Sequence, residues 1–158
     1  MSYPIEIIRH SLAHVMAAAI KKLYGDVKFA GGPAIENGFY YDFDTEHKFT
    51  PEDFTKIEKE MRDLIKSNGR FEQKNVSLDE AKKIFADQPY KMEWLNEYDA
   101  AGEALSIYNF RDFTDLCRGP HVESSKDLPR DSFKIRTVAG AYWKGDSRNK
   151  MLQREHVD

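Results

Sequence analysis

The first stretch of the chain repeats apolar residues at helical spacing. From Ile5 to Tyr24 they fall on one side of a helix that turns about 100° per residue. These residues are Ile5, Ile8, Leu12, Val15, Met16, Ala19, Ile20 and Leu23. Pro4 and Gly25 suit the two ends of such a helix. His10 and His14 lie opposite the stripe among alanines, so the pattern predicts a long helix that presents two imidazoles to a cleft.

Two shorter helical patterns and several strand patterns follow. Thr50-Pro51 opens a helical stripe that ends near Asn68-Gly69, and Ser77 with Glu80 forms a capping box for another that ends near Pro89. Gly31-Gly32-Pro33 is typical of a turn. Alternating or apolar runs predict strands at residues 37–43, with Phe39, Tyr41 and Phe43 on one face, and at 70–76, 105–110 and 133–138.

This order of elements defines the expected fold class. Helices and strands do not alternate regularly, which favours an α+β fold with a mainly antiparallel sheet over a doubly wound one. We expect the long N-terminal helix and the further helices to pack on that sheet around a central cleft. The 158 residues, 41% of them hydrophobic, fit one domain over residues 1–158.

Charge and cysteine content limit the expected partners and cellular compartment of the protein. The net charge of −3 gives no global positive field, so contact with nucleic acid needs a local basic patch. Basic residues gather in the last quarter, where they either meet phosphates or form a solvated surface: Arg118, Arg130, Lys134, Arg136, Lys144, Arg148, Lys150 and Arg154. A single cysteine, no signal peptide and no apolar run near ~18 residues predict a soluble, cytoplasmic protein with no membrane segment.

Two pairs of residues carry candidate chemistry. His10 and His14 are side by side on the predicted helix, and Cys117 and His121 repeat the same spacing where Gly119 and Pro120 can turn the chain. Together they form a plausible tetrahedral zinc site, or they hold and polarise a water. The alternative is ordinary: histidines at the edge of the core and a cysteine that packs as a small hydrophobe.

Two further residues have weaker support from pattern. Asp115 shares a face with Cys117 if the segment is extended, and its carboxylate then either anchors an ammonium group or caps a loop. Lys91 is one of many lysines, and composition alone gives it little weight.

The ordered motifs resemble a known family. They are Ile8–His14, Asn37–Asp42, Asp115–His121, Ala139–Asp146 and Asn149–Arg154. This set closely resembles the N-terminal editing domain of bacterial-type threonyl-tRNA synthetase, over about residues 5–154. Editing proteins for alanyl-tRNA are more distant relatives that share the two spaced pairs. The HxxxH spacing alone is weak evidence, whereas the ordered set is strong.

The resemblance implies hydrolytic editing of mischarged tRNA. The substrate would be the 3′ acceptor end of tRNA(Thr) carrying serine, cleaved at its ester by an activated water. Because one methyl group is worth only about 1–3 kcal/mol, a second pocket that excludes threonine is needed. These residues leave no length for aminoacylation, so we expect either part of a larger synthetase or a freestanding deacylase acting in trans.

The resemblance also implies roles for individual residues. His10 and Lys91 would manage protons, while His14 and His121 position substrate or water. Asp115 would hold the serine ammonium or hydroxyl, Cys117 would shape the pocket, and Tyr41 would lie against the nucleotide or seryl group.

Metal content separates the remaining alternatives. In the alanyl relatives the same ligand types bind zinc, whereas the threonyl pocket is regarded as metal-free, and we favour no cofactor. If zinc is bound, its ligands would be His10, His14, Cys117 and His121. The rival hypotheses are a non-catalytic tRNA-binding module with a structural zinc and a zinc-dependent hydrolase of the alanyl type or for small substrates.

Overall fold

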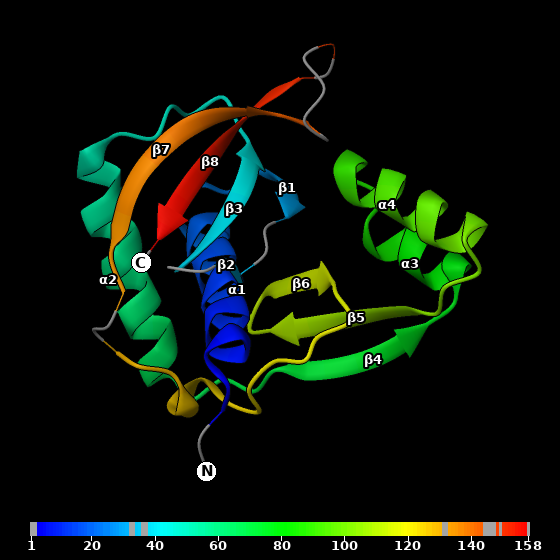
Figure 1. The fold of residues 1–158 in the computed structure, drawn as a ribbon, viewed down its shortest axis with the longest axis horizontal. Coiled ribbons are helices and arrows are strands. Elements are labelled where there is room, and N and C mark those ends of the chain that lie inside the picture. Colours follow the sequence, from blue (N-terminus) through cyan, green and yellow to red (C-terminus); the bar gives the residue numbers. More distant parts are fainter. Residues whose placement is uncertain are drawn as a thin grey trace.

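The computed structural model describes residues 3–31, 34–35, 38–130, 133–143, 148 and 150–157 (Figure 1). The helices are α1 (Ile5–Tyr24), α2 (Pro51–Lys66), α3 (Leu78–Ile84) and α4 (Pro89–Ala100), with a 3-10 turn, η1 (Ser125–Asp127). The strands are β1 (Lys28–Gly31), β2 (Ala34–Ile35), β3 (Gly38–Asp44), β4 (Glu72–Val76), β5 (Leu105–Phe110), β6 (Phe113–Leu116), β7 (Ile135–Tyr142) and β8 (Met151–Val157).

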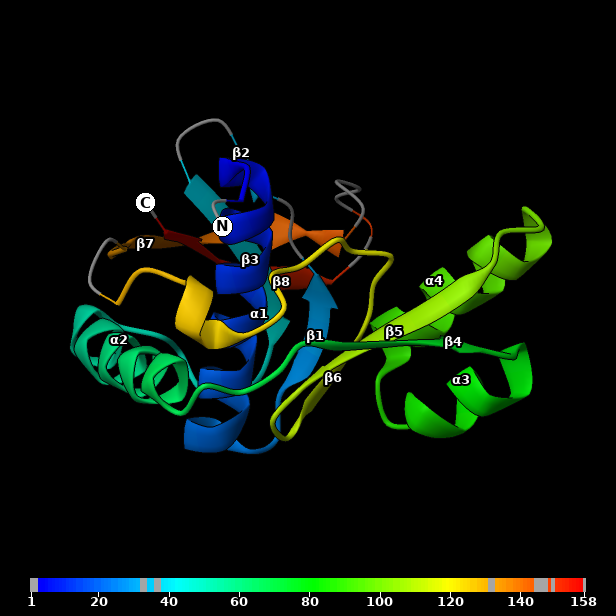
Figure 2. The same cartoon turned by 90° about the horizontal axis from the view of Figure 1, so that it is seen from below.

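The described strands form two antiparallel sheets. The larger has the order β1-β3-β8-β7, with β2 also paired to β3, and the smaller has the order β4-β5-β6. Figure 2 shows the smaller sheet reaching from α1 toward α3 and α4. The predicted α+β class with a long N-terminal helix is therefore confirmed.

Helix α1 lies at the centre of the packing. It contacts α2, β3 of the larger sheet and β5 and β6 of the smaller one. Every residue from Ser11 to Ile20 is buried, including Ala13, Ala17 and Ala18 on the side that the sequence assigned to the imidazoles. These alanines are small, so neighbouring elements approach the helix closely. The helix is therefore buried on more than one side, not only along the predicted apolar stripe, and His14 lies in the interior of the protein.

Local signals set several element boundaries as predicted. Gly25, with φ of 72°, follows α1. The Asp53 carboxylate accepts a hydrogen bond of 2.9 Å from the Thr50 N–H at the start of α2, and Ser77 Oγ accepts one of 3.2 Å from the Glu80 N–H at the start of α3. Strand β3 buries the predicted aromatic face of Phe39, Tyr41 and Phe43 against α1.

Other elements were not predicted from the pattern. Helix α3 ends at Ile84, and Pro89 opens a further helix, α4, at its first position. Strands β1, β2, β6 and β8 were also missed. Residues 32–33 of the predicted turn lie outside the described residues, as do Asn37, residues 144–146 and Asn149 of the motifs, of which Lys144 also belongs to the basic group. No helix within the described ranges is long and apolar enough to span a membrane.

Candidate active site

A buried carboxylate joins four elements of the fold. Asp115 is on β6, and its Oδ1 lies 2.5 Å from Lys91 Nζ of α4. Its Oδ2 lies 3.0 Å from His14 Nε2 of α1 and accepts a 2.9 Å hydrogen bond from the Tyr41 hydroxyl of β3. Lys91 Nζ also donates to the Tyr41 hydroxyl at 3.3 Å. These contacts join four buried side chains into one network, which we call the Asp115 network: Asp115, Lys91, His14 and Tyr41.

The Asp115 network is held together by charge. Burial alone would raise the pKa of Asp115, but Lys91 and His14 hold it well below its usual range. Burial would lower the pKa of His14, yet Asp115 outweighs it and raises that pKa to about 9. Burial and the Asp115 charge raise the pKa of Tyr41 well above its ordinary value. At neutral pH a carboxylate is therefore bound by two cations and a neutral phenol.

The two sequence pairs meet beside this network. Cys117 Sγ lies 3.3 Å from His121 Nε2 and 3.8 Å from His10 Nε2. The His121 ring centroid is 4.1 Å from that of His14 and 4.5 Å from that of His10. Helix α1 and the turn after β6 thus bring four candidate residues together, which we call the His–Cys cluster: His10, His14, Cys117 and His121.

A glycine shapes the turn that brings Cys117 and His121 together. Gly119 has φ of 75°, and its N–H donates to Cys117 Sγ at 3.2 Å. A Cβ atom at this position would lie only 2.5 Å from the Tyr108 hydroxyl oxygen. Both the backbone angle and the space therefore require glycine.

The His–Cys cluster has the donor set of a zinc site. One ligand atom from each of its four residues lies within 4.8 Å of the others. Burial would raise the pKa of the Cys117 thiol, but hydrogen bonds with His10, His121 and His14 lower it to about 4. Burial and the charge of His14 lower the pKa of His121 to about 4. Thiolate and neutral imidazole are the forms that ligate metals, so Cys117 and His121 are already in ligating forms, whereas His14 would have to give up the proton that Asp115 stabilises.

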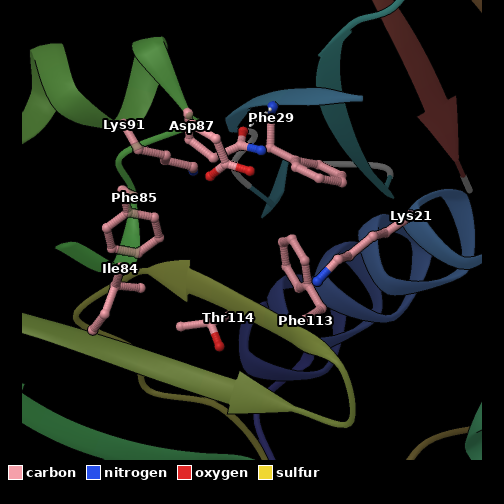
Figure 3. Close-up of a pocket in the computed structure, with 9 residues that line it drawn as sticks. Lys21, Phe29, Ile84, Phe85, Asp87, Lys91, Phe113 and Thr114 are labelled. Atoms are coloured by element: carbon pink, nitrogen blue, oxygen red, sulfur yellow. Dashed lines mark hydrogen bonds between the residues drawn. The ribbon is translucent and has the colours of Figure 1, made fainter. Parts of the chain in front are cut away.

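The candidate residues border two described pockets. His10 and Cys117 line one of about 240 Å³, together with Tyr98 and Arg118. Lys91 lines another of about 250 Å³, whose aromatic walls come from β1, β6 and the end of α3 (Figure 3). These walls are formed by Phe29, Phe113 and Phe85. Lys91 belongs to the Asp115 network, and the ring centroid of His14, another member, lies 5.5 Å from that of His10, so the network connects the two pockets.

Several basic residues near the C-terminal end pair with carboxylates. Arg154 makes two hydrogen bonds to Asp42, at 2.7 and 2.9 Å. Lys150 Nζ lies 2.9 Å from Asp44 Oδ1, and Arg118 bonds to Glu103 at 3.1 Å. The positive charge of these three residues is therefore partly neutralised within the protein.

One contact of the His–Cys cluster was missed in the sequence. Ser11 lies between the two helix histidines, and its Oγ is 3.2 Å from His121 Nδ1. The same oxygen accepts a 3.0 Å hydrogen bond from the Val122 N–H. No spacing rule marks a serine within an HxxxH segment, so only tertiary packing reveals this contact.

Comparison with known proteins shows which family part of the chain is similar to. Residues 105–154, which include β5, β6, Asp115, Cys117 and His121, match the family described as threonyl and alanyl tRNA synthetase second additional domain. This match identifies the class of domain to which the segment is similar.

The relatives to which the chain is similar are threonine–tRNA ligases. The chain is 51% identical over 150 residues to the threonine–tRNA ligase of Staphylococcus carnosus (strain TM300), covering 95% of this chain and 23% of that protein. The ligase of Staphylococcus aureus (strain JH9) gives the same identity and coverage. The chain thus spans about a quarter of these relatives and is similar to the editing-domain region of threonyl-tRNA synthetase, as its motifs predicted.

Proposed function

We propose that this chain hydrolyses the ester of serine wrongly attached to the 3′ end of tRNA(Thr), as the editing domain of a larger synthetase. The observation that carries the proposal is the junction of the Asp115 network with the His–Cys cluster. It brings a lysine ammonium, a carboxylate and three imidazoles together beside two pockets. Proton donors and acceptors in close array are what ester hydrolysis by water requires.

His10 is the proposed base that activates the water. Its ring is half-buried and lines the pocket with Cys117, so water and substrate can reach it. His14 is unsuited to that role, because Asp115 keeps it protonated up to about pH 9. We therefore assign His14, with His121, to holding the substrate or the water in place.

Lys91 is the proposed acid for the leaving group. Water adds to the ester carbonyl carbon, and His10 takes its proton. The bond between that carbon and the ribose oxygen then breaks, and Lys91 gives the ribose oxygen a proton. The products are free serine and tRNA with its hydroxyl restored. Asp115, 2.5 Å from Lys91 Nζ, orients the ammonium for this step.

Roles for three further residues stay predictions. Both Asp115 oxygens already contact side chains of the Asp115 network, so binding the serine ammonium or hydroxyl requires one of those contacts to yield. The Tyr41 hydroxyl reaches the substrate only through this network. Cys117 lines the pocket with His10, in keeping with a role in shaping it.

Variants of His10 and Lys91 test the proposal. Single-turnover hydrolysis of seryl-tRNA(Thr) should fall about 10²–10⁴-fold in His10→Ala and in Lys91→Ala, the usual loss when a general acid or base is removed. Lys66→Ala, at the exposed end of α2, is the matched control and should react as the wild type does. Variants of His10 and Lys91 as active as the control would remove both role assignments.

A structural zinc in a non-catalytic tRNA-binding module is the second candidate. The close grouping of the four ligand atoms of the His–Cys cluster favours it. A structural metal contributes folding free energy directly, so a chelator would then lower the melting temperature sharply. The metal-free proposal instead expects a chelator to change neither the melting temperature nor seryl-tRNA hydrolysis.

A further inference from the structure

The side chain of Gln88 pairs with the backbone of β1. Its Oε1 accepts a 2.8 Å hydrogen bond from the Phe29 N–H, and its Nε2 donates to the Val27 carbonyl oxygen at 3.3 Å. A backbone N–H can only donate and a carbonyl oxygen can only accept, so the two partners fix which end of the amide is the oxygen. The Gln88 side chain therefore makes two hydrogen bonds of defined direction with this part of the chain.

These two bonds take the place of a neighbouring strand. Among the described strands, β1 pairs only with β3, so its other edge has no strand partner there. A neighbouring strand would donate to one carbonyl oxygen of that edge and accept from the N–H two residues further along. The Gln88 amide makes the same pair of bonds, to Val27 and Phe29. It thereby attaches the start of α4 to one position along the edge of the larger sheet.

Gln88 is also the residue at which α4 begins. Its carbonyl oxygen accepts a 3.0 Å hydrogen bond from the Met92 N–H, which closes the first turn of the helix, while its side chain makes no capping bond. Lys91 lies in this turn, and its Nζ contacts Asp115 of the smaller sheet and Tyr41 of the larger one. The helix is thus held on β1 where it starts, and it places an ammonium between the two sheets within its first turn.

We infer that Gln88 is a positioning residue that sets where α4 starts on β1 and so holds Lys91 against Asp115. The end of β1 lies close to the ammonium, because a Cβ atom at Gly31 would be 3.7 Å from Lys91 Nζ. Gln88 and Lys91 also line the same pocket of about 250 Å³. A shift of α4 along β1 would therefore move the ammonium relative to the carboxylate and to this pocket.

This inference rests on the proposed function only where it concerns turnover. Lys91 is the proposed acid for the ribose oxygen, so a displaced ammonium would slow the breaking of the ester bond more than it weakens substrate binding. A misplacement of about 1 Å can cost about 10²-fold in rate. The attachment of Gln88 to β1 and the position of Lys91 can both be measured without substrate.

A second glutamine makes the same pair of bonds elsewhere and provides the matched control. Gln153 of β8 accepts a 2.9 Å hydrogen bond from the Phe49 N–H through Oε1, and its Nε2 donates at 2.7 Å to the His47 carbonyl oxygen. Both glutamines are half-buried, and Gln153 belongs to neither the Asp115 network nor the His–Cys cluster. Methionine has a similar length and no amide, so Gln88→Met and Gln153→Met remove equivalent bonds at different places.

Amide hydrogen exchange tests the attachment to β1. In Gln88→Met, the Phe29 amide hydrogen should exchange with water about fivefold faster or more, because it loses its acceptor. The Phe49 amide should be unchanged. In Gln153→Met the two amides should respond in the opposite way. Unchanged exchange of the Phe29 amide in Gln88→Met would overturn the inference.

Nitrogen NMR of lysine-labelled protein tests the position of Lys91. Its ammonium, assigned by loss of the signal in Lys91→Ala, should be visible in the wild type because burial against Asp115 slows exchange of its hydrogens with water. The signal should weaken in Gln88→Met and persist in Gln153→Met. Absence of the signal in the wild type, an unchanged signal in Gln88→Met, or equal weakening in both variants would overturn the inference.

Gln88→Asn separates the attachment from the stability of α4. Asparagine is favoured at a helix N-cap, so α4 should form, but its amide is one carbon closer to the backbone and falls short of β1. This variant should show the same changes in exchange and in the Lys91 signal as Gln88→Met, and it serves if Gln88→Met does not fold. Wild-type exchange and a wild-type Lys91 signal in Gln88→Asn would overturn the inference.

Turnover gives a separate readout. In Gln88→Met and in Gln88→Asn, kcat for seryl-tRNA(Thr) should fall about 10–100-fold with a smaller change in KM, whereas Gln153→Met should keep the wild-type kcat. Equal kcat in Gln88→Met and Gln153→Met would contradict the assigned role of Gln88. Absence of hydrolysis by the wild type would defeat the proposed function, while the amide exchange and the Lys91 signal would still decide whether Gln88 positions Lys91.

Discussion

Lys91 Nζ and Asp115 Oδ1 lie 2.5 Å apart, with side chains only 6% and 4% exposed. Removing one partner of a buried ion pair leaves the other charge unpaired, so Asp115→Asn should lower the free energy of unfolding by about 3 kcal/mol or more. Urea unfolding at pH 7 measures this. The control is Asp63→Asn, which breaks the exposed pair with Lys59 and should cost less than about 1 kcal/mol. Equal losses in the two variants would contradict a buried ionic network.

The pH dependence of stability should reflect two opposed groups. The pKa of His14 is raised from 6.5 to about 9, so its contribution is complete below pH 6.5 and is lost as pH rises to about 9. The pKa of Cys117 is lowered from 9.0 to about 4, so its contribution is complete above pH 9 and is lost as pH falls. Between pH 6.5 and 9 the two slopes have opposite signs and should nearly cancel in the wild type.

Without the Cys117 thiol, the effect of His14 on the pH dependence of stability should become visible. In Cys117→Ser, the free energy of unfolding should fall by up to about 3 kcal/mol as the pH rises from 6.5 to about 9, the ordinary and the raised pKa of His14. In this range His14 loses one proton when the protein unfolds, which changes the free energy of unfolding by about 1.4 kcal/mol per pH unit. Urea unfolding at intervals across that range gives the slope. A Cys117→Ser protein whose stability rises over the same range would contradict the charged state assigned to His14.

Gly119 should be sensitive to a single added carbon. In Gly119→Ala, the new Cβ would meet Tyr108 and the positive φ would strain the backbone, so stability should fall by more than about 1 kcal/mol and seryl-tRNA hydrolysis should drop. Gly102→Ala is the control, because Gly102 has a similar φ of 71° but no atom within 4 Å of the added Cβ. Gly102→Ala should lose only the stability that the strained backbone costs, and it should hydrolyse seryl-tRNA at the wild-type rate. Equal activity in the two variants would argue against a fitted turn.

Helix α4 is tied to the larger sheet beside Lys91. The Tyr90 hydroxyl donates to Asp44 at 2.6 Å, and its ring packs on that of Trp143 with centroids 4.8 Å apart. Tyr90→Phe should cost about 1–2 kcal/mol and slow hydrolysis, since Lys91 is the next residue of the helix.

A second tyrosine separates placement of Lys91 from stability alone. Tyr24→Phe removes a similar bond, 2.8 Å to Asp53, away from the site, and should lose similar stability at normal activity. If both tyrosine variants keep full activity while folded, the placement of Lys91 does not depend on the contact between Tyr90 and Asp44.

Local sequence signals predicted the elements whose causes are local. Helices α2 and α3 begin at capping residues, and β3 has one aromatic face, so their patterns identified them. Helix α4 has no apolar stripe, because its buried residues are Tyr90, Lys91 and Leu95, which contact different neighbours. Strand β8 is largely polar and is defined by its pairing with β3 and β7. Tertiary contacts alone determine these two elements.

The candidate site divides in the same way. Spacing predicted that His10 would lie near His14 and Cys117 near His121, because helix and turn geometry act over four residues. That the two pairs meet is a property of the packing of α1 on β6. Lys91 had no local signal and entered only through the resemblance to a family. The structural reason to consider Lys91 is its buried contact with Asp115.

The most direct test of the central claim compares two charged tRNAs under the same conditions. Wild-type protein is mixed with seryl-tRNA(Thr) or threonyl-tRNA(Thr), and the initial rate of ester hydrolysis is measured for each. Since one methyl group is worth about 10–200-fold in discrimination, seryl-tRNA should be cleaved at least about tenfold faster. Equal rates on the two substrates, or no hydrolysis of seryl-tRNA above the uncatalysed rate, would contradict the account.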